Sequence, residues 1–355
     1  MPLSLSDGSR LLVIKPSSLG DIVLALPAVA ALRRWCPGAT LTWLVKPEWR
    51  EILEGNPDID EIVTLPASAC SLLQTVALLR SKRFDLVVDL QGLFRSGLLA
   101  LLTGAPVRVG FAGAREGSSF FYTHRVSLPV PKAPWRFLDM HAVDRNLAVA
   151  ASLGADIESV QFPIPSFPSD ELAIEGWLEQ AGVQPGDQLI AIAPLDRGGV
   201  RSWPLERFVA AARALSQARG VRIVLMGASA DSTISAEFRK AVGDKLVDLL
   251  GKTRVRQMGT LLRRVHVLIA NDSAPIHIAA AVGTRVVALF GPTSPVRSRP
   301  YADGHVVLRV PIACSPCEKR TCANPKHFEC LTAITVAEVV EAAMRLLEQP
   351  LTMER

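Results

Sequence analysis

The chain has 355 residues, a net charge of +5 and 49% hydrophobic residues. This length exceeds what one hydrophobic core usually supports, so the sequence predicts two domains. No apolar run reaches the roughly 18 to 20 residues of a membrane span, and the chain starts without the features of a signal peptide. We therefore expect a soluble protein with a cytoplasmic location.

Positive charge is concentrated in the first half of the chain. Between Arg80 and Arg136, nine lysines and arginines stand against three acidic residues. This excess favours an anionic partner, such as a phosphorylated substrate or an acidic membrane surface, although a solvated basic face gives the same pattern. Nucleic acid is disfavoured, because aromatic residues do not alternate with the basic ones and no nucleic-acid motif is present.

Short β-rich runs alternate with helical stretches in the first half. The predicted strands are Leu11–Lys15, Thr40–Val45, Glu61–Leu65 and Asp85–Leu90. The predicted helices lie at about residues 21–35, near Trp49, and at about 72–80 and 139–153. This alternation predicts a parallel sheet covered by helices. Residues 154–186 contain four prolines around one helix, and the boundary between domains 1–165 and 166–335 is placed there.

The second half repeats this alternation. Its predicted strands are Leu189–Ala193, Arg222–Met226, Leu246–Leu249, Val267–Ala270 and Val286–Phe290. Its predicted helices cover about residues 204–219, 231–242, 275–282 and 336–348. The sequence thus predicts a second Rossmann-like domain, with a ligand held in a cleft between the two domains. The C-terminal residues 336–355 contain a helix that could cross back to the first domain.

The stretch from Ile269 to His277 combines a buried strand, a polar turn and a helix N-terminus, and Leu289–Thr293 adds a second strand with a Gly/Pro turn. The first N–H groups of a helix placed at the carboxyl ends of parallel strands can hold a phosphate without a dedicated cation. A phosphorylated ligand is therefore predicted. Asp272 could instead cap the helix, and His277 could be a core histidine.

The first strand is followed by the turn Lys15-Pro-Ser-Ser-Leu-Gly-Asp21. It lacks the G-x-G-x-x-G pattern of a dinucleotide site, which argues against NAD or FAD. Asp21 starts a helix, so it is either an N-cap or a general base aimed at the ligand.

Two further strand-edge loops carry charged residues in the second half. Arg197 and Arg201 lie in the loop between residues 193 and 204 and could bind phosphate, or could be solvated loop arginines. Asp231 follows the strand that ends at Met226, where an acid can accept ribose hydroxyls or cap the next helix.

Four of the six cysteines are clustered, with the spacing C-x2-C-x4-C-x7-C at Cys314, Cys317, Cys322 and Cys330. This spacing permits tetrahedral thiolate ligation of a structural zinc, while reduced thiols are the alternative. Disulfides are disfavoured in a cytoplasmic protein.

Taken together, these motifs resemble family 9 glycosyltransferases, the lipopolysaccharide heptosyltransferases. The likeness runs from Leu11 to about Leu347. Four blocks carry it: Val13–Ile22 with Leu26-Pro-Ala28, Asp89–Ser96, Arg201-Ser-Trp-Pro204, and Asn271–His277 with Phe290-Gly-Pro-Thr293. The resemblance implies the two-domain GT-B fold and metal-independent transfer, with inversion, of heptose from ADP-L-glycero-β-D-manno-heptose.

The resemblance also implies roles for single residues. Asp21 matches the catalytic base. Arg201 takes the place of a lysine that binds the donor phosphate, and Asp231 matches a slightly longer acid that contacts the ribose. The turn of Asp272, Ser273 and Ala274, with His277 behind it, matches the donor-binding turn. Ala274 replaces the usual Gly, which makes a positive φ costly there.

For the acceptor, the resemblance implies Ser18, Arg95, Ser96 and Arg115 as binding residues. The expected acceptor is Kdo-lipid A, or the first heptose on it, at the inner face of the cytoplasmic membrane. The first half looks more like the enzyme that adds the first heptose, and the cysteine cluster more like the one that adds the second. Alternatives are a different sugar nucleotide, an epimerase, or a non-catalytic glycolipid-binding module.

Overall fold

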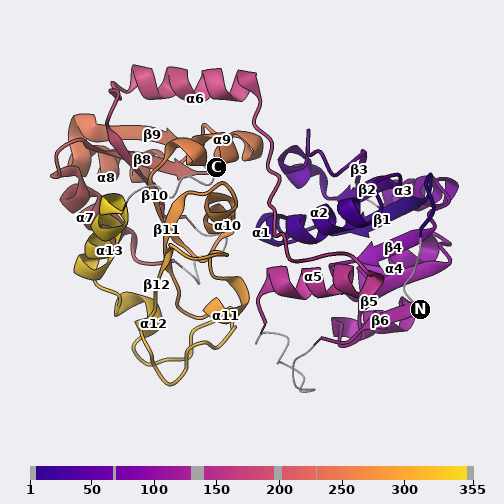
Figure 1. Ribbon diagram of the computed structural model, residues 1–355. Helices are drawn as coiled ribbons and strands as arrows, with labels where there is room; N and C mark the ends of the chain where they lie inside the picture. Colours follow the sequence, from indigo (N-terminus) through magenta and orange to yellow (C-terminus); the bar gives the residue numbers. More distant parts are fainter. Residues whose placement is uncertain (1–4, 67–68, 129–139, 196–201, 229, 350–355) are drawn as a thin grey trace. The chain divides into compact units, whose positions relative to one another are not determined.

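The computed structural model describes residues 5–66, 69–128, 140–195, 202–228 and 230–349. Within this part of the chain there are two compact units, the first ending at Pro165 and the second beginning at Ser166. Each unit contains one parallel six-stranded sheet with flanking helices (Figure 1). The predicted doubly wound α/β class is confirmed.

The first sheet has the strand order β3-β2-β1-β4-β5-β6. Its strands are β1 (Arg10–Ile14), β2 (Thr40–Val45), β3 (Glu61–Thr64), β4 (Leu86–Asp89), β5 (Val107–Phe111) and β6 (His124–Val126). Its helices are α1 (Leu19–Val23), α2 (Leu26–Trp35), α3 (Ala69–Ser81), α4 (Phe94–Leu102) and α5 (Ala142–Leu153), with 3-10 helices η1 (Pro47–Ile52) and η2 (Arg115–Phe121). Ile14 pairs with both Leu44 and Asp89, so β1 and β4 end side by side.

The central strands are continuously apolar because helices cover both faces of the sheet. In β1 the four residues from Leu11 to Ile14 are at most 1% exposed. The single helix predicted for residues 21–35 is in fact two, α1 and α2. The break lies just before Pro27, whose ring and missing N–H prevent a continuous helical hydrogen-bond ladder.

The second sheet has the order β12-β11-β10-β7-β8-β9. Its strands are β7 (Gln188–Ala193), β8 (Val221–Gly227), β9 (Leu246–Leu250), β10 (Val267–Asn271), β11 (Arg285–Leu289) and β12 (Val306–Leu308). The helices are α6 (Pro168–Gln180), α7 (Leu205–Ser216), α8 (Ser232–Val242), α9 (Val255–Arg264), α10 (Ala274–Ala281), α11 (Pro295–Ser298), α12 (Glu329–Thr332) and α13 (Val336–Glu348), with η4 (Gly243–Lys245). Asn271 pairs with Leu289, so the turns after β10 and β11 lie at one edge.

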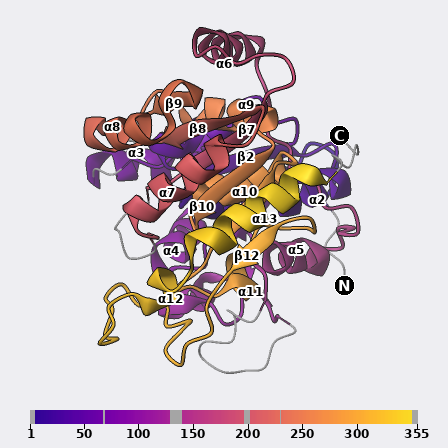
Figure 2. The same ribbon diagram turned by 90° about the vertical axis from the view of Figure 1, so that its left-hand side faces the viewer.

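The C-terminal helix α13 belongs to the second unit, whereas the sequence suggested that it could cross back to the first. Figure 2 shows it running across the second sheet beside α7. Val339, Ala343 and Leu346 are part of the same apolar core as Trp203 and Phe208. Burying this apolar stripe on its own unit's sheet is what holds the helix there. No described helix has the length and apolarity to span a membrane.

Candidate active site

Asp21 lies in the first turn of α1, at the carboxyl edge of the first sheet. Its Oδ2 accepts hydrogen bonds from the Ser18 backbone N–H at 3.2 Å and from the Ser18 hydroxyl at 2.7 Å. Asp21 is partly exposed and Ser18 is exposed. This arrangement is a capping box, which holds the carboxylate at the N-terminal end of α1. The structure thus brings together two residues that the sequence assigned separately to base and acceptor.

Lys15, directly after β1, is 3% exposed. Its Nζ donates to the Leu90 carbonyl at 3.0 Å, and its own carbonyl accepts from Trp43 Nε1 at 3.1 Å. Lys15 therefore ties the turn that carries Asp21 to the turn after β4. Lys15 is not among the residues predicted for the site, although a lysine at the end of a continuously apolar strand indicates a buried cation.

A buried carboxylate organises the turn after β4. Asp89 is 0% exposed and accepts hydrogen bonds from the Tyr122 hydroxyl at 2.7 Å and from the backbone N–H groups of Gln91 and Gly92. Burial raises the pKa of Asp89, and these hydrogen bonds oppose the increase. Burial also raises the pKa of Tyr122, and the nearby Asp89 charge adds to this effect. The pair fixes the backbone from which α4 starts.

The predicted acceptor residues lie in different environments. Arg95 is exposed near the start of α4, whereas Ser96 is 3% exposed and its hydroxyl bonds to the backbone of Leu93. Ser96 thus has a capping role in this structure, which sequence spacing cannot distinguish from ligand binding. The backbone of Arg115 begins η2, and its side chain lies outside the described part.

Exposed aromatic rings accompany Arg95. Phe94 is 46% exposed and Phe120 is 79% exposed. Phe94 packs edge-to-face on Phe121, with ring centroids 5.2 Å apart. Single exposed rings are ordinary, but Phe94 next to the exposed Arg95 makes the start of α4 amphipathic. This feature is not predicted from the sequence, because neither helix α4 nor 3-10 helix η2 is expected there.

Only part of the basic stretch remains available for a ligand. Lys82 pairs with Glu61 at 2.7 Å, and the Arg108 guanidinium donates to the carbonyls of Ala105 and Phe121. By contrast, Arg80 and Arg125 are exposed. Lys132 and Arg136 lie outside the described residues.

The predicted donor turn lies between β10 and α10. Asp272 is 4% exposed, and its Oδ1 accepts from the Ser298 hydroxyl at 3.4 Å. Ser273 is the N-cap residue of α10, and its hydroxyl donates to the Asn271 carbonyl at 3.2 Å. Ala274 begins the helix and does not have a positive φ, so replacement of the usual Gly causes no strain there. His277 is buried within α10, as a core histidine would be.

Asn271, at the end of β10, binds both sides of the neighbouring loop. Its Oδ1 accepts from the Trp203 backbone N–H at 2.9 Å, and its Nδ2 donates to the Pro194 carbonyl at 2.9 Å. Residues 196–201 of that loop, which include Arg197 and the predicted phosphate ligand Arg201, lie outside the described residues. Asn271 belongs to one of the blocks that carry the family resemblance. Its role as the anchor of this loop, however, can be recognised only from the fold.

Asp231 is the N-cap of α8. Its Oδ1 accepts from the backbone N–H groups of Thr233 and Ile234 at 3.0 and 3.2 Å, which is the capping alternative. The side chain is exposed and lines a pocket of about 780 Å³ together with Ser235, Arg239 and Lys252. Capping through one oxygen is compatible with a ligand contact at the other.

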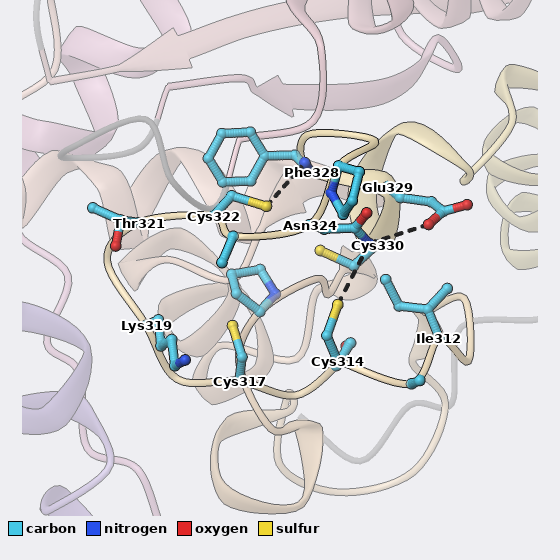
Figure 3. Close-up of a pocket in the computed structure, with 15 residues that line it drawn as sticks. Ile312, Cys314, Cys317, Lys319, Thr321, Cys322, Asn324, Phe328, Glu329 and Cys330 are labelled. Carbon is cyan, nitrogen blue, oxygen red and sulfur yellow. Dashed lines mark hydrogen bonds between the residues drawn. The ribbon is translucent and has the colours of Figure 1, made fainter.

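The four clustered cysteines line a single pocket of about 380 Å³ (Figure 3). The Phe328 backbone N–H donates to Cys322 Sγ at 3.2 Å, and Asn324 Nδ2 donates to Cys314 Sγ at 3.5 Å. Burial raises the pKa of Cys330, and the other three thiols add to this effect. Among the described residues, however, no three His, Cys, Asp or Glu side chains form a set that could hold a metal ion. The predicted tetrahedral site is therefore not assembled in this conformation.

Comparisons with known proteins identify the family of this chain. The model of the family described as "Glycosyltransferase family 9 (heptosyltransferase)" matches residues 73–327. Lipopolysaccharide heptosyltransferase 3 of Escherichia coli is 27% identical over 300 residues, which cover 81% of this chain and 85% of that protein.

Two solved structures have the same fold over nearly their whole length. The glycosyl transferase family 9 protein of Veillonella parvula DSM 2008 aligns with a TM-score of 0.81 and 23% identity, covering 96% of this chain and 97% of that one. E. coli ADP-heptose lps heptosyltransferase II aligns with a TM-score of 0.75 and 22% identity, covering 95% and 98%. The predicted GT-B fold class is confirmed. Since the family model covers more than half of the chain, this protein belongs to glycosyltransferase family 9, the heptosyltransferases, and is an enzyme.

Proposed function

We propose that the enzyme transfers L-glycero-D-manno-heptose from ADP-heptose to the inner core of lipopolysaccharide, with inversion. The acceptor would be Kdo-lipid A or the first heptose on it. The observation that carries the proposal is the carboxylate of Asp21, held by Ser18 at the sheet edge of a family 9 enzyme. The structural likeness to E. coli ADP-heptose lps heptosyltransferase II supports the choice of donor.

In the proposed mechanism, Asp21 removes the proton from an acceptor hydroxyl as that oxygen attacks the anomeric carbon of heptose. The bond between the anomeric carbon and the diphosphate oxygen breaks, and ADP leaves from the opposite face, which inverts the anomeric configuration. The N-terminus of α10 and Arg201 would stabilise the charge that develops on ADP. Asp231 would contact the ribose. This mechanism requires no metal ion.

The acceptor would bind to the first unit. Arg95 and Arg115 would bind its phosphate or carboxylate groups, and the exposed rings of Phe94 and Phe120 would contact its apolar parts. Ser18 would contact the reacting sugar. A lipid-linked acceptor also implies peripheral association of this cytoplasmic enzyme with the inner membrane, and the exposed Arg80 and Arg125 would favour anionic lipids. Salt-sensitive cosedimentation with anionic but not neutral vesicles would test that association.

We also propose that the four clustered cysteines can take up a structural metal, with zinc as the first candidate. They line one pocket, and backbone and amide N–H groups already donate to two of the sulfurs. A bound zinc would supply cross-linking of the loop but no part of the transfer chemistry. Elemental analysis of purified protein tests this proposal. Loss of metal in Cys322→Ser, with retention in a variant of the isolated Cys36, would support it; metal-free wild type purified with zinc present would contradict it.

The decisive experiment is a panel of donors and acceptors. We expect ADP-heptose to be consumed only when Kdo-lipid A, or Kdo-lipid A bearing one heptose, is present. Turnover with another sugar nucleotide would change the substrate, and interconversion of the donor without an acceptor would indicate an epimerase. Glycolipid binding without any nucleotide release would point to a non-catalytic module. The acceptor that is consumed also determines which heptose is added.

A further inference from the structure

The segment Cys314–Cys330, here called the cysteine loop, is bonded to the turn Gly291–Ser294 that follows β11. The backbone N–H groups of Cys317 and Glu318 both donate to the Pro292 carbonyl, at 2.9 and 2.8 Å. The loop therefore contacts a turn that lies at the same sheet edge as the predicted donor turn.

Two side chains of the loop extend this contact. The Ser315 hydroxyl donates to the Gly291 carbonyl at 2.6 Å, and Glu318 Oε1 accepts from the Ser294 backbone N–H at 2.8 Å. Each of these bonds engages a backbone group of the turn that would otherwise require water or a ligand as its partner. The turn is thus held at its beginning and at its end.

Close packing holds the turn from a second direction. A Cβ atom added at Gly291 would lie 2.5 Å from Leu331 Cγ and 3.1 Å from Cys330 Sγ. These distances leave no room for a side chain, so Gly is required for the approach of α12. The turn Gly291–Ser294 is therefore enclosed between the cysteine loop and helix α12, which begins at the end of that loop.

The turn Gly291–Ser294 is linked through α11 to the predicted donor turn, which begins at Asp272. Ser294 is the N-cap of α11, and Ser298 at the end of α11 donates to Asp272 Oδ1 at 3.4 Å. A displacement of Gly291–Ser294 would therefore move a hydrogen-bond partner of Asp272. In a doubly wound sheet, ligands bind outside the carboxyl ends of the strands at the point where the strand order reverses, which here lies between β7 and β10. The turn after β10 is at this point, and the turn after β11 is next to it in the sheet.

We infer that Ser315 and Glu318 are positioning residues for the donor. They hold Gly291–Ser294 in the geometry that receives the diphosphate of the nucleotide sugar, and they do so without touching it. The inference rests on the proposed function for the identity of the ligand. It gives the cysteine loop a role in donor affinity, whether or not its thiols carry a metal.

The test uses the full-length enzyme with Ser315→Ala and Glu318→Gln. Because each substitution weakens a single hydrogen bond, we expect the Kd for ADP and the KM for the donor to rise about 3- to 10-fold, with kcat unchanged. Ser315→Thr keeps the hydroxyl and should restore affinity. Glu341→Gln, which removes the same charge at an exposed site on α13, should behave as wild type. Titration calorimetry with ADP and circular dichroism give the affinity and the state of folding.

An unchanged ADP affinity in both folded variants would overturn the inference, as would a loss in kcat alone. If a variant fails to fold, Ser315→Thr and the remaining variant decide. The proposed function fails separately, because then the wild type itself would not bind ADP. In that case the same variants, titrated with the nucleotide that the donor panel identifies, still test whether the cysteine loop positions the turn.

Discussion

At the scale of single residues, one short contact defines the candidate base. Ser18 donates twice to the same oxygen of Asp21, through its backbone and through its hydroxyl. These two bonds orient the carboxylate of Asp21. A capping box is usually structural, but here it lies at the edge where a doubly wound sheet binds its ligand.

Asp21→Asn should reduce kcat by about 10²- to 10⁴-fold, which is what a general base contributes. The amide preserves the shape of the side chain and can still accept from Ser18, so folding and ADP affinity should be unaffected. Steady-state kinetics with ADP-heptose and calorimetry with ADP measure the two effects. Asp7→Asn, at an exposed position, is the control. Turnover at the wild-type rate would remove Asp21 from the mechanism.

A second prediction concerns the buried Asp89–Tyr122 pair. Burial raises the pKa of Asp89 above its usual value of 3.8, and the Tyr122 hydroxyl lowers it again by stabilising the carboxylate. Tyr122→Phe therefore destabilises the ionised form of Asp89 more than its protonated form. A raised folded-state pKa favours the folded state at low pH, and this advantage is lost as the pH rises through that pKa. The variant should lose most stability at neutral pH.

Urea denaturation of Tyr122→Phe and wild type between pH 7 and about pH 4 measures this difference. We expect a loss of about 1–3 kcal/mol at neutral pH, because a buried carboxylate loses a donor. The loss should diminish as the pH falls toward the usual pKa of the carboxyl. A loss that is independent of pH would mean that the hydroxyl does not stabilise the charge on Asp89.

At the scale of elements, one side chain at the end of β10 holds both ends of a loop. Asn271 is completely buried and bonds to Pro194 and Trp203, which flank the segment that carries Arg201. Trp203 is also anchored through its indole N–H, which donates to the Ile334 carbonyl at 3.0 Å. The two ends of the loop are therefore held by the core of the second unit.

Asn271→Ala should destabilise the protein by about 2–4 kcal/mol, since it leaves a buried N–H and a buried carbonyl without partners. The KM for the donor should rise as well, because the loop that carries the proposed phosphate ligand loses its anchor. Equilibrium unfolding in urea and donor kinetics measure the two effects. Gln217→Ala, at an exposed position after α7, is the matched control. Wild-type stability in Asn271→Ala would contradict the anchoring role.

At the scale of the whole molecule, each unit has its own apolar core. One cluster contains Leu12, Leu44 and Val87 of the first sheet, and another contains Ile192, Ile269 and Val287 of the second. The proposed donor residues all belong to the second unit, and the proposed base belongs to the first. Nucleotide binding and proton removal are thereby assigned to separate folding units.

ADP should therefore protect the second unit selectively. At about 100 times its Kd, a ligand stabilises the unit that binds it by about 2.7 kcal/mol. Hydrogen-exchange mass spectrometry should show slower exchange in peptides covering residues 267–294, with residues 10–26 unchanged. Protection confined to the first unit would overturn the assignment of the donor residues.

The class of fold and the order of the central elements can be predicted from the amino-acid sequence alone. Short continuous apolar runs such as Val267–Ala270, bounded by turn residues, favour strands that are buried on both faces, and the polar turns after them follow from that assignment. The family can also be identified from the sequence, because each of the blocks around Asp21, Arg201 and Asp272 consists of residues that are neighbours in the chain.

Which polar residues meet depends on how the chain folds in three dimensions. Ser96 proved to be a capping residue, α13 packs on its own unit, and the cysteines line one pocket without forming a set of metal ligands. Lys15, Asn271, Ser315 and Glu318 gained their roles from partners between 24 and 77 positions away in the chain. Local patterns report which face of an element is buried, but a hydrogen bond between distant residues depends on how strands are ordered within a sheet.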